Sequence, residues 1–558
     1  MLFSLSFPGK SFAAAETPQP KYDIQEYANA MQPGWNLGNS FDGFDTGKDV
    51  FDETAWGNPR VTKELIDKIA QQGFKSIRIP ITFATRLDQD NKINPEFLDR
   101  IQKVVDWSLD AGMKVMINVH HDSWNWIANM PYDHDNTVTK YNAIWTQLAD
   151  RFKDYPLDLM FESLNEPQFY TGDTNQNIQY LNELNASFYH IVRNSGGKND
   201  IRPLVLPTLN TGSEPEKVDA LYNFISGLHD PYIIATVHYY GYWPFSVNIA
   251  GYSSFEKDTM NDIVKTFDRV HDKFSANGIP VVIGEYGLLG FDQNTGTIEQ
   301  GEKLKYFEFM INYAQEKGLV HMLWDNGQHF NRTSYVWNDP QLYEMMKASW
   351  SGHSATADTD FIYLKQGVKI KNVTKKLDLK GNHLASLQLD GRDLKWGKDY
   401  VLDGEDLIIK ASFLSGLRSD KIGKIAILTA HFNHGANWYF NIYKYDTPVF
   451  GDSQGTTSNF KIPVQFNGTQ LRTMEAKYTD DGSNAGPQNW TSYKEFGYAF
   501  SPSIENNNVS FPYGTDRFFK EVADGREVEL TFHFWSGEAI TYKITKNGDQ
   551  VAGTALEK

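Results

Sequence analysis

The sequence predicts an α/β fold, a closed (β/α)8 TIM barrel followed by two small all-β sandwich domains. In roughly the first 350 residues, apolar β-rich runs alternate with stretches of helical period, and eight such runs can be counted. Near-continuous apolar runs are typical of parallel strands that are buried on both faces. Beyond about residue 352 the helical stretches stop, and short alternating strands separated by turn signals replace them.

Eight apolar runs supply the expected barrel strands. They are GWNLG (34–38), FKSIRIPI (74–81), KVMINVHH (114–121), LDLMFESLNEP (157–167), RPLVLPTL (202–209), YIIATVHYY (232–240), PVVIGEYG (280–287) and VHMLWDNG (320–327). The helical pattern at 95–112 places Phe97, Ile101, Val104, Val105 and Leu109 on one face and ends at Gly112. No glycine-rich phosphate loop follows the first run, which disfavours an open dinucleotide-binding sheet.

Domain boundaries are predicted where the composition changes. We expect a tail or signal-peptide remnant at 1–20, the barrel at 21–352, and β modules at 353–447 and 448–558. The first boundary falls in SGHSATADTD and the second in VFGDSQGTTSN, both rich in turn-forming residues. The short apolar and alanine-rich start of the chain predicts secretion.

Composition narrows the classes of partner. The formal charge of −17 disfavours nucleic acid and anionic membranes, so neutral or cationic ligands are favoured. No apolar run approaches the length that spans a bilayer. The chain has no cysteine, which removes disulfides, thiol nucleophiles and thiolate metal sites.

Polar side chains gather at the predicted C-terminal ends of the strands, where barrels of this type build their active sites. They are Asn39, Arg78, His120, His121, Asn165, Glu166, His238, Tyr240, Glu285 and Trp324. Solvation of the loop starts would not require so many ionisable, amide and aromatic groups at one rim. The set therefore predicts a site at this end of the barrel.

Glu166 and Glu285 end the fourth and seventh runs, which lie roughly opposite each other in an eight-stranded ring. Paired carboxylates across a cleft are the machinery of glycoside hydrolysis. Arg78 is expected to hold one carboxylate ionised, and the like charge of that neighbour is expected to raise the pKa of the other.

Together with the rim residues, the motifs NEP at 165–167 and EYG at 285–287 resemble glycoside hydrolase family 5. GWNLGNSFD, RIPITF, INVHHD, VHYY and LWDNG support the resemblance, and AWGNP is similar to the endo-β-1,4-glucanase and xyloglucanase branch. The resemblance covers about residues 25–350. It implies a retaining double displacement without cofactor, in which Glu166 is the acid/base and Glu285 the nucleophile.

The same resemblance implies roles for the substrate-binding set. Asn165 would bind the sugar 2-hydroxyl, and Arg78 and Tyr240 would position the nucleophile. Three histidines, His120, His121 and His238, would line the site. Trp324 would be a stacking platform on the non-reducing side of the scissile bond, and Asn39 would contact the next sugar out.

Several side chains have more than one interpretation. His120 and His121 suggest a metal site, but adjacent strand residues point to opposite faces, so no metal is predicted. Trp35, Trp124, Trp126 and Trp243 are sugar platforms or ordinary loop packing. Asp42 is a candidate substrate contact, whereas Glu53 is expected to be an ordinary surface acid.

The C-terminal region resembles two modules that accompany such barrels. Residues 357–447 resemble the immunoglobulin-like X2 module, and residues 450–558 resemble carbohydrate-binding family 46. Trp490 and Trp535 are candidate exposed stacking residues, with a core role equally open for Trp535. The terminal module is expected to extend the cleft, so truncation after about residue 352 should lower activity on polymers more than on short oligosaccharides.

The expectation that follows is a secreted bacterial, monomeric cellulase that cuts internal bonds of β-glucans. Cellulose, mixed-linkage glucan and xyloglucan are the candidate substrates. A β-mannanase and a narrow xyloglucanase are the alternatives among enzymes, and a non-catalytic carbohydrate-binding receptor is the alternative outside them. Retention of both glutamates and Arg78 favours an enzyme.

Overall fold

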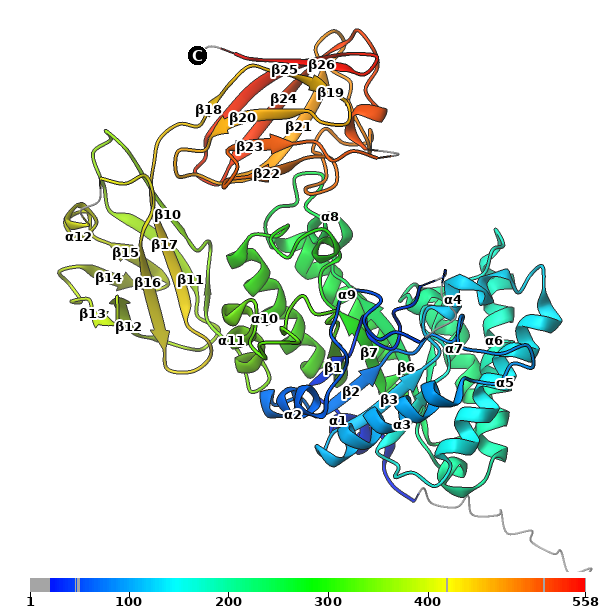
Figure 1. Ribbon diagram of the computed structural model, residues 1–558. Helices are drawn as coiled ribbons and strands as arrows, with labels where there is room; N and C mark the ends of the chain where they lie inside the picture. Colours follow the sequence, from blue (N-terminus) through cyan, green and yellow to red (C-terminus); the bar gives the residue numbers. More distant parts are fainter. Residues whose placement is uncertain (1–20, 46, 48–50, 418–419, 515–516, 557–558) are drawn as a thin grey trace, which may run out of the picture.

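A computed structural model of the 558-residue chain describes residues 21–45, 47, 51–417, 420–514 and 517–556. It contains a barrel, a first β module and a terminal β module, in chain order (Figure 1). The predicted fold class is therefore confirmed. The predicted signal remnant at 1–20 lies outside the described residues. Within them, no helix is both long and apolar enough to cross a membrane.

Eight parallel strands form the closed barrel, and each overlaps one predicted apolar run. They are β1 (Gly34–Asn36), β2 (Ser76–Ile79), β3 (Lys114–Asn118), β4 (Leu159–Glu162), β5 (Leu204–Pro207), β6 (Ile233–Tyr239), β7 (Val281–Tyr286) and β8 (Leu319–Leu323). The ring closes because β8 pairs with β1 in parallel register. The strand ends therefore share one rim, as the sequence predicts.

Helices follow the strands and cover the outside of the barrel. They are α2 (Lys63–Gln72), α3 (Pro95–Asp110), α5 (His134–Phe152), α6 (Thr174–Asn194), α7 (Pro215–Leu228), α9 (Lys257–Lys273), α10 (Gln300–Glu316) and α11 (Pro340–Ser349). In α3, the Asn94 side chain caps the first turn, and the apolar face from Phe97 to Val105 is buried. Two short helices, α4 (Asp122–Asn125) and α8 (Trp243–Ser246), lie on the rim after β3 and β6.

The opposite end of the barrel is closed by α1 (Ile24–Asn29), a helix that the sequence analysis did not predict. Asp23 caps its N-terminus by accepting from the backbone N–H groups of Gln25 and Glu26. Ile24 and Ala28 belong to a buried cluster with methionines and valines from the barrel strands. This plug removes apolar side chains at the barrel floor from water and leaves the rim as the open end.

The first β module packs two sheets face to face. One sheet has the order β10 (Phe361–Lys365), β17 (Trp438–Tyr445), β16 (Gly423–Phe432), β12 (Leu384–Leu389) and β13 (Arg392–Asp393). The other has the order β14 (Tyr400–Asp403), β15 (Asp406–Ile409), β11 (Val373–Asp378) and β9 (Thr356–Ala357), and a short helix, α12 (Ala411–Gly416), follows β15. Its buried apolar side chains form one continuous cluster with those of the barrel.

A buried glutamate on α10 joins the barrel to the first module. One carboxylate oxygen of Glu308 accepts from the Ser354 backbone N–H at 3.2 Å and lies 2.9 Å from His353 Nδ1. The other accepts from the Lys380 ammonium. Because the Glu308 carboxylate is fully buried, each of these contacts is needed to offset its desolvation.

The terminal module also packs two sheets, with the orders β18-β20-β23-β22 and β19-β26-β25-β24-β21. Their bounds are β18 (Val449–Phe450), β20 (Lys461–Gln465), β23 (Asn508–Ser510), β22 (Ser501–Ser503), β19 (Ser453–Thr456), β26 (Gln550–Ala555), β25 (Ala539–Asn547), β24 (Glu527–Phe534) and β21 (Leu471–Tyr478). This module has its own hydrophobic core. In Figure 1 it lies beside α8, at the rim end of the barrel.

The terminal module touches the barrel mainly through polar groups on the segment 248–254. Phe496 N–H donates to the Asn248 carbonyl at 3.2 Å, and Ala250 N–H donates to the Tyr493 carbonyl at 3.3 Å. Arg472 Nε donates to Ser253 Oγ at 2.6 Å. This contact places the terminal module next to a loop that follows β6 on the active-site side of the barrel.

Candidate active site

A hollow of about 430 Å³ opens at the rim of the barrel. Eight of the ten predicted site residues line it, namely Asn39, His120, His121, Asn165, Glu166, Tyr240, Glu285 and Trp324. The other two, Arg78 and His238, are almost fully buried and contact the lining glutamates from the protein side. The residues predicted from the strand ends are therefore neighbours in space.

Arg78, at the end of β2, organises the floor of the hollow. Its guanidinium is fully buried and donates to four side chains, Glu285 Oε1 at 2.6 Å, Glu162 Oε2 at 2.7 Å, Asn165 Oδ1 at 2.7 Å and Asn36 Oδ1 at 3.0 Å. Burial opposes the charge, but the two carboxylates outweigh it and raise the pKa of Arg78. The arginine therefore stays cationic and fixes groups from three other strands.

Glu285 lies on β7 with its carboxylate held from two sides. Arg78 Nη1 donates to Oε1, and the Tyr240 hydroxyl donates to Oε2 at 2.6 Å. Burial and then the Glu285 charge raise the pKa of Tyr240 well above its ordinary value, so the phenol keeps its proton for this bond. The Glu285 carboxylate is 6% exposed, which leaves it a narrow face toward the hollow.

An irregularity in β7 aims this carboxylate. The register of β6 and β7 shifts so that His238 pairs with Glu285 one residue out of step. The extra residue is Gly284, where an added Cβ would come within 2.8 Å of Thr236 Oγ1 and 3.1 Å of His238 Nε2. Glycine is therefore required at this bulge, and bulges of this kind redirect side chains beside active sites.

Glu166 follows β4 in a strained backbone conformation, with φ of +38°. Its side chain is 43% exposed, and Oε1 lies 3.0 Å from His238 Nδ1. Burial raises the pKa of Glu166, but the hydrogen bond and charge of His238, aided by Arg78 and His121, lower it overall. The expectation that a like charge raises the pKa of the acid is therefore wrong for the protein without substrate, since His238, together with Arg78 and His121, lowers the pKa of Glu166 by more than burial raises it.

The two glutamates approach each other closely. One ligand-type atom each of Glu166, His238 and Glu285 lies within 4.8 Å of the others, so one carboxylate oxygen of Glu166 is no farther than that from one of Glu285. Retaining glycosidases separate their carboxyl groups by about 5–5.5 Å, whereas inverting ones need about 6.5–9.5 Å to admit a water molecule. The spacing here fits direct attack by one carboxylate.

Two stacked rings form one wall of the hollow. Trp324 follows β8, and its indole lies parallel to the His120 imidazole, with centroids 5.8 Å apart and planes 1° apart. Burial lowers the pKa of His120 well below its ordinary value, so the imidazole is neutral at neutral pH. The indole edge lies against Gly38, where a Cβ would come within 2.9 Å. The ring is thereby fixed in place as an apolar surface.

The loop after β1 supplies the next part of the wall. Both oxygens of Asp42 accept from backbone N–H groups, those of Asn39 at 3.0 Å and Ser40 at 2.8 Å. This turn holds Asn39 in a left-handed conformation, with φ of +55°, at the edge of the hollow. His121 Nε2 lies 3.4 Å from Asp42 Oδ2. Asp42 is therefore fully buried and supports Asn39 and His121 from behind.

Two sets of side chains have the composition of a metal site, Asp42 with His120 and His121, and Glu166 with His238 and Glu285. In the first set the two histidines follow the end of β3, and their rings lie 4.4 Å apart, so the expectation of opposite faces is wrong. His121 Nδ1 accepts from Trp124 Nε1 at 3.0 Å. Hydrogen bonds thus already engage Asp42, His120 Nδ1, His121 Nδ1, Glu166 Oε1 and both oxygens of Glu285.

The structure decides between the two alternatives for Trp35 and corrects the expectation for Glu53. Trp35 is fully buried and donates from Nε1 to Asp325 Oδ2 at 3.0 Å, so it is a core side chain and no sugar platform. Glu53 is 4% exposed and accepts from Arg100 Nε at 2.5 Å and from the Val61 N–H at 2.9 Å. It is therefore a buried structural acid and not a surface one.

The two tryptophans proposed for the terminal module lie in different surroundings. Trp490 is 58% exposed, and its ring is 6.1 Å from that of Trp243 on α8. The Trp535 ring instead packs against Phe361 of the first module, at 5.8 Å, and under the Arg472 guanidinium, at 4.8 Å. We therefore interpret Trp535 as part of the junction between modules, and Trp490 as the exposed platform.

Sequence reasoning missed several groups at the site. Glu162 lies four residues before Glu166 and accepts from Arg78 and from Asn118 Nδ2 at 2.8 Å. An acid inside an otherwise apolar run was the available signal, since a buried carboxylate needs a partner. The hollow is also lined by loop residues that no strand end indicated, namely Trp56, Leu289, Phe291, Asp292, Asn326 and Gln328.

Comparison with known proteins agrees with this geometry. Residues 37–330 match the sequence family described as cellulase (glycosyl hydrolase family 5). Residues 356–442 match carbohydrate binding domain X2, and residues 446–554 match the CBM46 carbohydrate binding domain. Endoglucanase B of Paenibacillus lautus is 53% identical over 555 residues, which span 98% of this chain and 96% of the relative.

Two solved structures share the three-part architecture. The full-length tri-modular endo-β-1,4-glucanase B from Bacillus halodurans is 54% identical, with a TM-score of 0.93 over 96% of this chain and 100% of that one. A tri-modular family 5, subfamily 4, endo-β-1,4-glucanase from Bacillus licheniformis, solved with cellotetraose, is 28% identical. Its TM-score is 0.79, over 96% of this chain and 100% of that one.

Proposed function

Since this chain belongs to glycosyl hydrolase family 5, the cellulase family, we propose that it is a retaining endo-β-1,4-glucanase that cuts internal bonds of β-glucans. The observation that carries the proposal is the close approach of the Glu166 and Glu285 carboxylates, within 4.8 Å, across an open hollow. That spacing favours attack by a carboxylate over attack by an interposed water molecule.

In the first step, a Glu285 carboxylate oxygen attacks the anomeric carbon and forms a glycosyl ester as the glycosidic bond breaks. Glu166, in its protonated form, gives its proton to the departing glycosidic oxygen. In the free protein His238 favours the ionised form of Glu166. A bound glucan covers the exposed carboxylate, and the loss of water favours the neutral acid that this step requires.

In the second step, the Glu166 carboxylate takes a proton from a water molecule, whose oxygen attacks the same carbon. The ester bond to Glu285 breaks, and the carboxylate returns to its contacts with Arg78 and Tyr240. The configuration at carbon is retained because it is inverted twice. Each proton that Glu166 gives in the first step is regained in the second.

Asn165 is suited to bind the sugar 2-hydroxyl. Its Oδ1 accepts from Arg78 Nη2, so the amide orientation is fixed and the Nδ2 donor is left for the ligand. Trp324 offers an aromatic face for a sugar ring, as the sequence resemblance implies, and Asn39 lies beyond it on the same wall. These contacts would orient one chain of a β-glucan across the two glutamates.

The terminal module is proposed to extend this cleft. Gly497 lies against Gln293 and Thr297, directly after the loop whose Leu289 and Asp292 line the hollow. Exposed rings of Trp490 and Trp243 continue the surface outward from α8. A long or branched glucan therefore has further aromatic area to contact, whereas a short oligosaccharide does not reach it.

We also propose the substrate class, the location and the oligomeric state of the protein. The carbohydrate-binding domains and the relatives support a polysaccharide substrate and favour secretion, and we further propose that the protein is a monomer. We propose β-1,4-glucan, mixed-linkage glucan and xyloglucan as substrates, with mannan as the alternative. A panel of these four polymers, with release of reducing ends as the readout, decides between them.

The assignment of the two glutamates is tested by changing the leaving group. Glu166→Ala should lower kcat/KM on a polymeric glucan by about 1,000-fold or more, since the sugar leaving group needs a proton. On a dinitrophenyl cellobioside, whose phenolate leaves unaided, the first step should stay fast and release a burst of phenolate. Glu285→Gln should be inactive on both substrates. Equal losses on both substrates for Glu166→Ala would contradict its role as the acid.

A further inference from the structure

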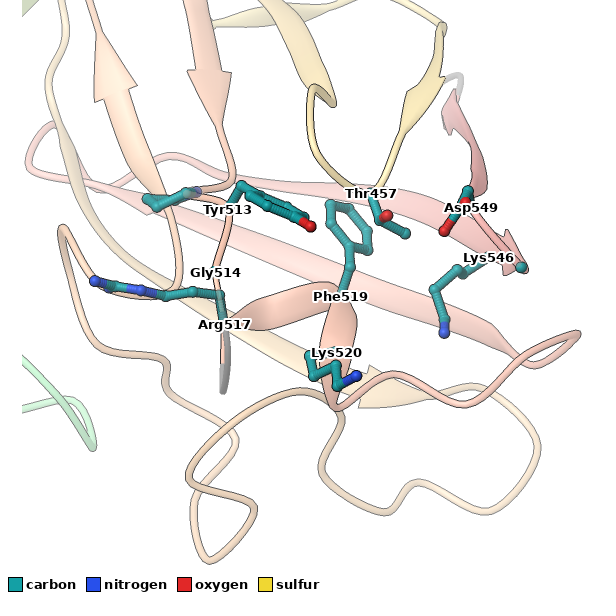
Figure 2. A pocket seen from close by; sticks show the side chains of 10 residues that line it. Thr457, Tyr513, Gly514, Arg517, Phe519, Lys520, Lys546 and Asp549 are labelled. Carbon is teal, nitrogen blue, oxygen red and sulfur yellow. The ribbon is translucent and has the colours of Figure 1, made fainter.

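The terminal module carries a second hollow, of about 570 Å³, at a place that does not contact the barrel. It lies between the turn that links β19 and β20, the residues 512–514 and 517–520, and the turn that links β25 and β26 (Figure 2). Its volume lies within the range of small-molecule sites, about 300–1,000 Å³. The residues that join this module to the barrel, such as Arg472 and Tyr493, are not among those that line it.

An aromatic pair gives the hollow its apolar surface. Phe519 is 4% exposed and is held edge to face by Phe460, at 5.5 Å between centroids. Tyr513 is 72% exposed, so most of its ring is in water. A tyrosine in this setting presents a large surface with few rotatable bonds, which lowers the entropy cost of stacking on a ligand.

Four polar side chains at the hollow are not used by the protein itself. Among the described residues, no hydrogen bond or ion pair engages the side chains of Thr457, Tyr513, Lys520 and Asp549. Lys546 also lines the hollow, but its ammonium is paired with Asp524 at 2.7 Å. Figure 2 shows these side chains around the hollow. The set offers two hydroxyls, one carboxylate and one ammonium to a ligand.

The charges decide which kind of ligand fits. An anion would meet the unpaired Asp549 carboxylate, and a cation would meet Lys520, Lys546 and Arg517, of which Lys546 is paired with Asp524 and Arg517 donates to the Tyr498 carbonyl at 3.0 Å. A neutral polyol satisfies both signs, because its hydroxyls donate to a carboxylate and accept from an ammonium. The pyranose ring also has an apolar face that can stack on the exposed tyrosine. Among common biological ligands, a neutral saccharide combines these properties.

We propose that this hollow, defined by Tyr513, Phe519, Thr457, Asp549 and Lys520, is a second binding site for neutral polysaccharide on the terminal module. The proposal deepens the proposed function, because it takes the ligand to be of the same class as the substrate. A glucan held here remains close to the catalytic barrel, so its concentration near the cleft is raised.

The test is affinity electrophoresis of the full-length chain carrying Glu285→Gln, so that the polysaccharide in the gel is not cut. Hydroxyethyl cellulose and mixed-linkage β-glucan are the neutral probes, and polygalacturonate is the anionic probe. Tyr513→Ala should raise the apparent Kd for the neutral probes about fivefold or more, and Lys520→Gln should raise it by a smaller factor. Trp396→Ala, which removes a 71% exposed ring from the first module, is the matched control and should change nothing.

The same variants are repeated with Trp490→Ala, so that binding along the cleft does not mask the second site. Equal retardation of Tyr513→Ala and its parent in both backgrounds would overturn the proposal. So would retardation of the parent by polygalacturonate and not by the neutral probes. Failure of the proposed function is separate, since it would show as no release of reducing ends by the chain that keeps Glu285.

Discussion

At the scale of single residues, Arg78 does more than any other side chain to define the site. It holds Glu285, Glu162 and Asn165 together from a fully buried position. A planar guanidinium can serve several acceptors in fixed directions, whereas an ammonium cannot. The spacing of the two glutamates therefore depends on an arginine that does not line the hollow.

Arg78→Lys tests this dependence. We expect a loss of stability of about 3 kcal/mol, since Glu162 keeps a buried charge with fewer donors. We also expect kcat/KM to fall about 100-fold in the folded protein, because Glu285 loses its fixed position. The measurements are chemical denaturation and initial rates on a soluble glucan.

Arg202→Lys is the matched control for that experiment. Arg202 is also fully buried, and its guanidinium donates to Asn199 and to the carbonyls of Pro156 and Leu159, away from the rim. It should lose stability while kcat/KM of the folded protein stays unchanged. A similar fall in kcat/KM for both variants would show that Arg78 acts only through stability.

His238 is expected to set the alkaline limb of the pH profile. In the free protein its hydrogen bond and charge lower the pKa of Glu166 against the opposite effect of burial. His238→Ala removes both, so the pKa of Glu166 rises and the acid stays protonated to higher pH. The alkaline limb of kcat/KM against pH should therefore move to higher pH.

His238→Gln separates the two contributions of the imidazole. The amide of Gln can keep a hydrogen bond to Glu166 but carries no charge, so the limb should move by a smaller amount. An alkaline limb that stays in place in both variants would contradict the assignment of Glu166 as the titrating acid.

At the scale of elements, the contact between α10 and β10 buries two carboxyl groups side by side. Glu299, the N-cap residue of α10, shares a hydrogen bond with Asp360, which precedes β10, so one of the two carries a proton. Burial, and then the neighbouring carboxylates including Glu302, raise the pKa of Glu299 well above its ordinary value. Burial likewise raises the pKa of Asp360. The charged partners nearby are Lys305, paired with Glu302, and Lys375.

The pair predicts a loss of stability at alkaline pH. The pKa values of Glu299 and Asp360 are both higher in the folded protein than in the unfolded chain. Their contribution to the free energy of unfolding is therefore fully present below the unfolded-state pKa values, near pH 4. It is lost as the pH rises through the folded-state pKa values. In Asp360→Asn, the amide oxygen remains a hydrogen-bond acceptor and the amide N–H group becomes a donor for the Glu299 carboxylate. The variant has one ionisable carboxyl group fewer at this contact. The melting temperature at pH 8 should rise by about 3 °C or more and change little at pH 4.5. No gain at pH 8 would show that water reaches the pair.

The strands and loops show which parts of the fold and the site could be predicted from the sequence. Eight apolar runs predicted eight barrel strands and their shared rim, because burial on both faces leaves a clear signature at each strand. The plug helix α1 was missed because six residues carry too little periodicity. Trp56 and Asp292 were missed because loops are placed by tertiary contacts and carry no strand-end signal. Trp35 stayed undecided between a sugar platform and packing because a sequence does not show which face of a strand meets the core, and the structure places it in the core.

At the scale of the whole molecule, the three parts are joined in two different ways. The barrel and the first module share one apolar cluster, and Glu308 links them from a buried position. The terminal module keeps a separate core and meets the barrel through contacts such as that of Arg472 with Ser253. A truncation that tests the terminal module should therefore end at residue 447, since one at 352 would also expose shared apolar surface.

A chain that ends at residue 447 should keep its activity on cellotetraose and lose about tenfold in kcat/KM on xyloglucan or insoluble glucan. The reason is that only long or branched chains reach the platform of Trp490 and Trp243. The full-length Trp490→Ala variant should show part of the same loss. Equal losses on short and long substrates would mean that the terminal module acts on the fold of the barrel and not on the ligand.

The two kinds of junction also bear on how such proteins are inherited. Recombination that exchanges the terminal module leaves its separate core intact and needs to match surface contacts only, chiefly those with the segment 248–254 and the packing of Trp535 on Phe361, so this part can be replaced as a cassette. Exchange of the first module must also reproduce the lysine, histidine and backbone donors that surround Glu308. The barrel and its first β module should therefore descend together as one lineage, while the terminal module can be drawn from another.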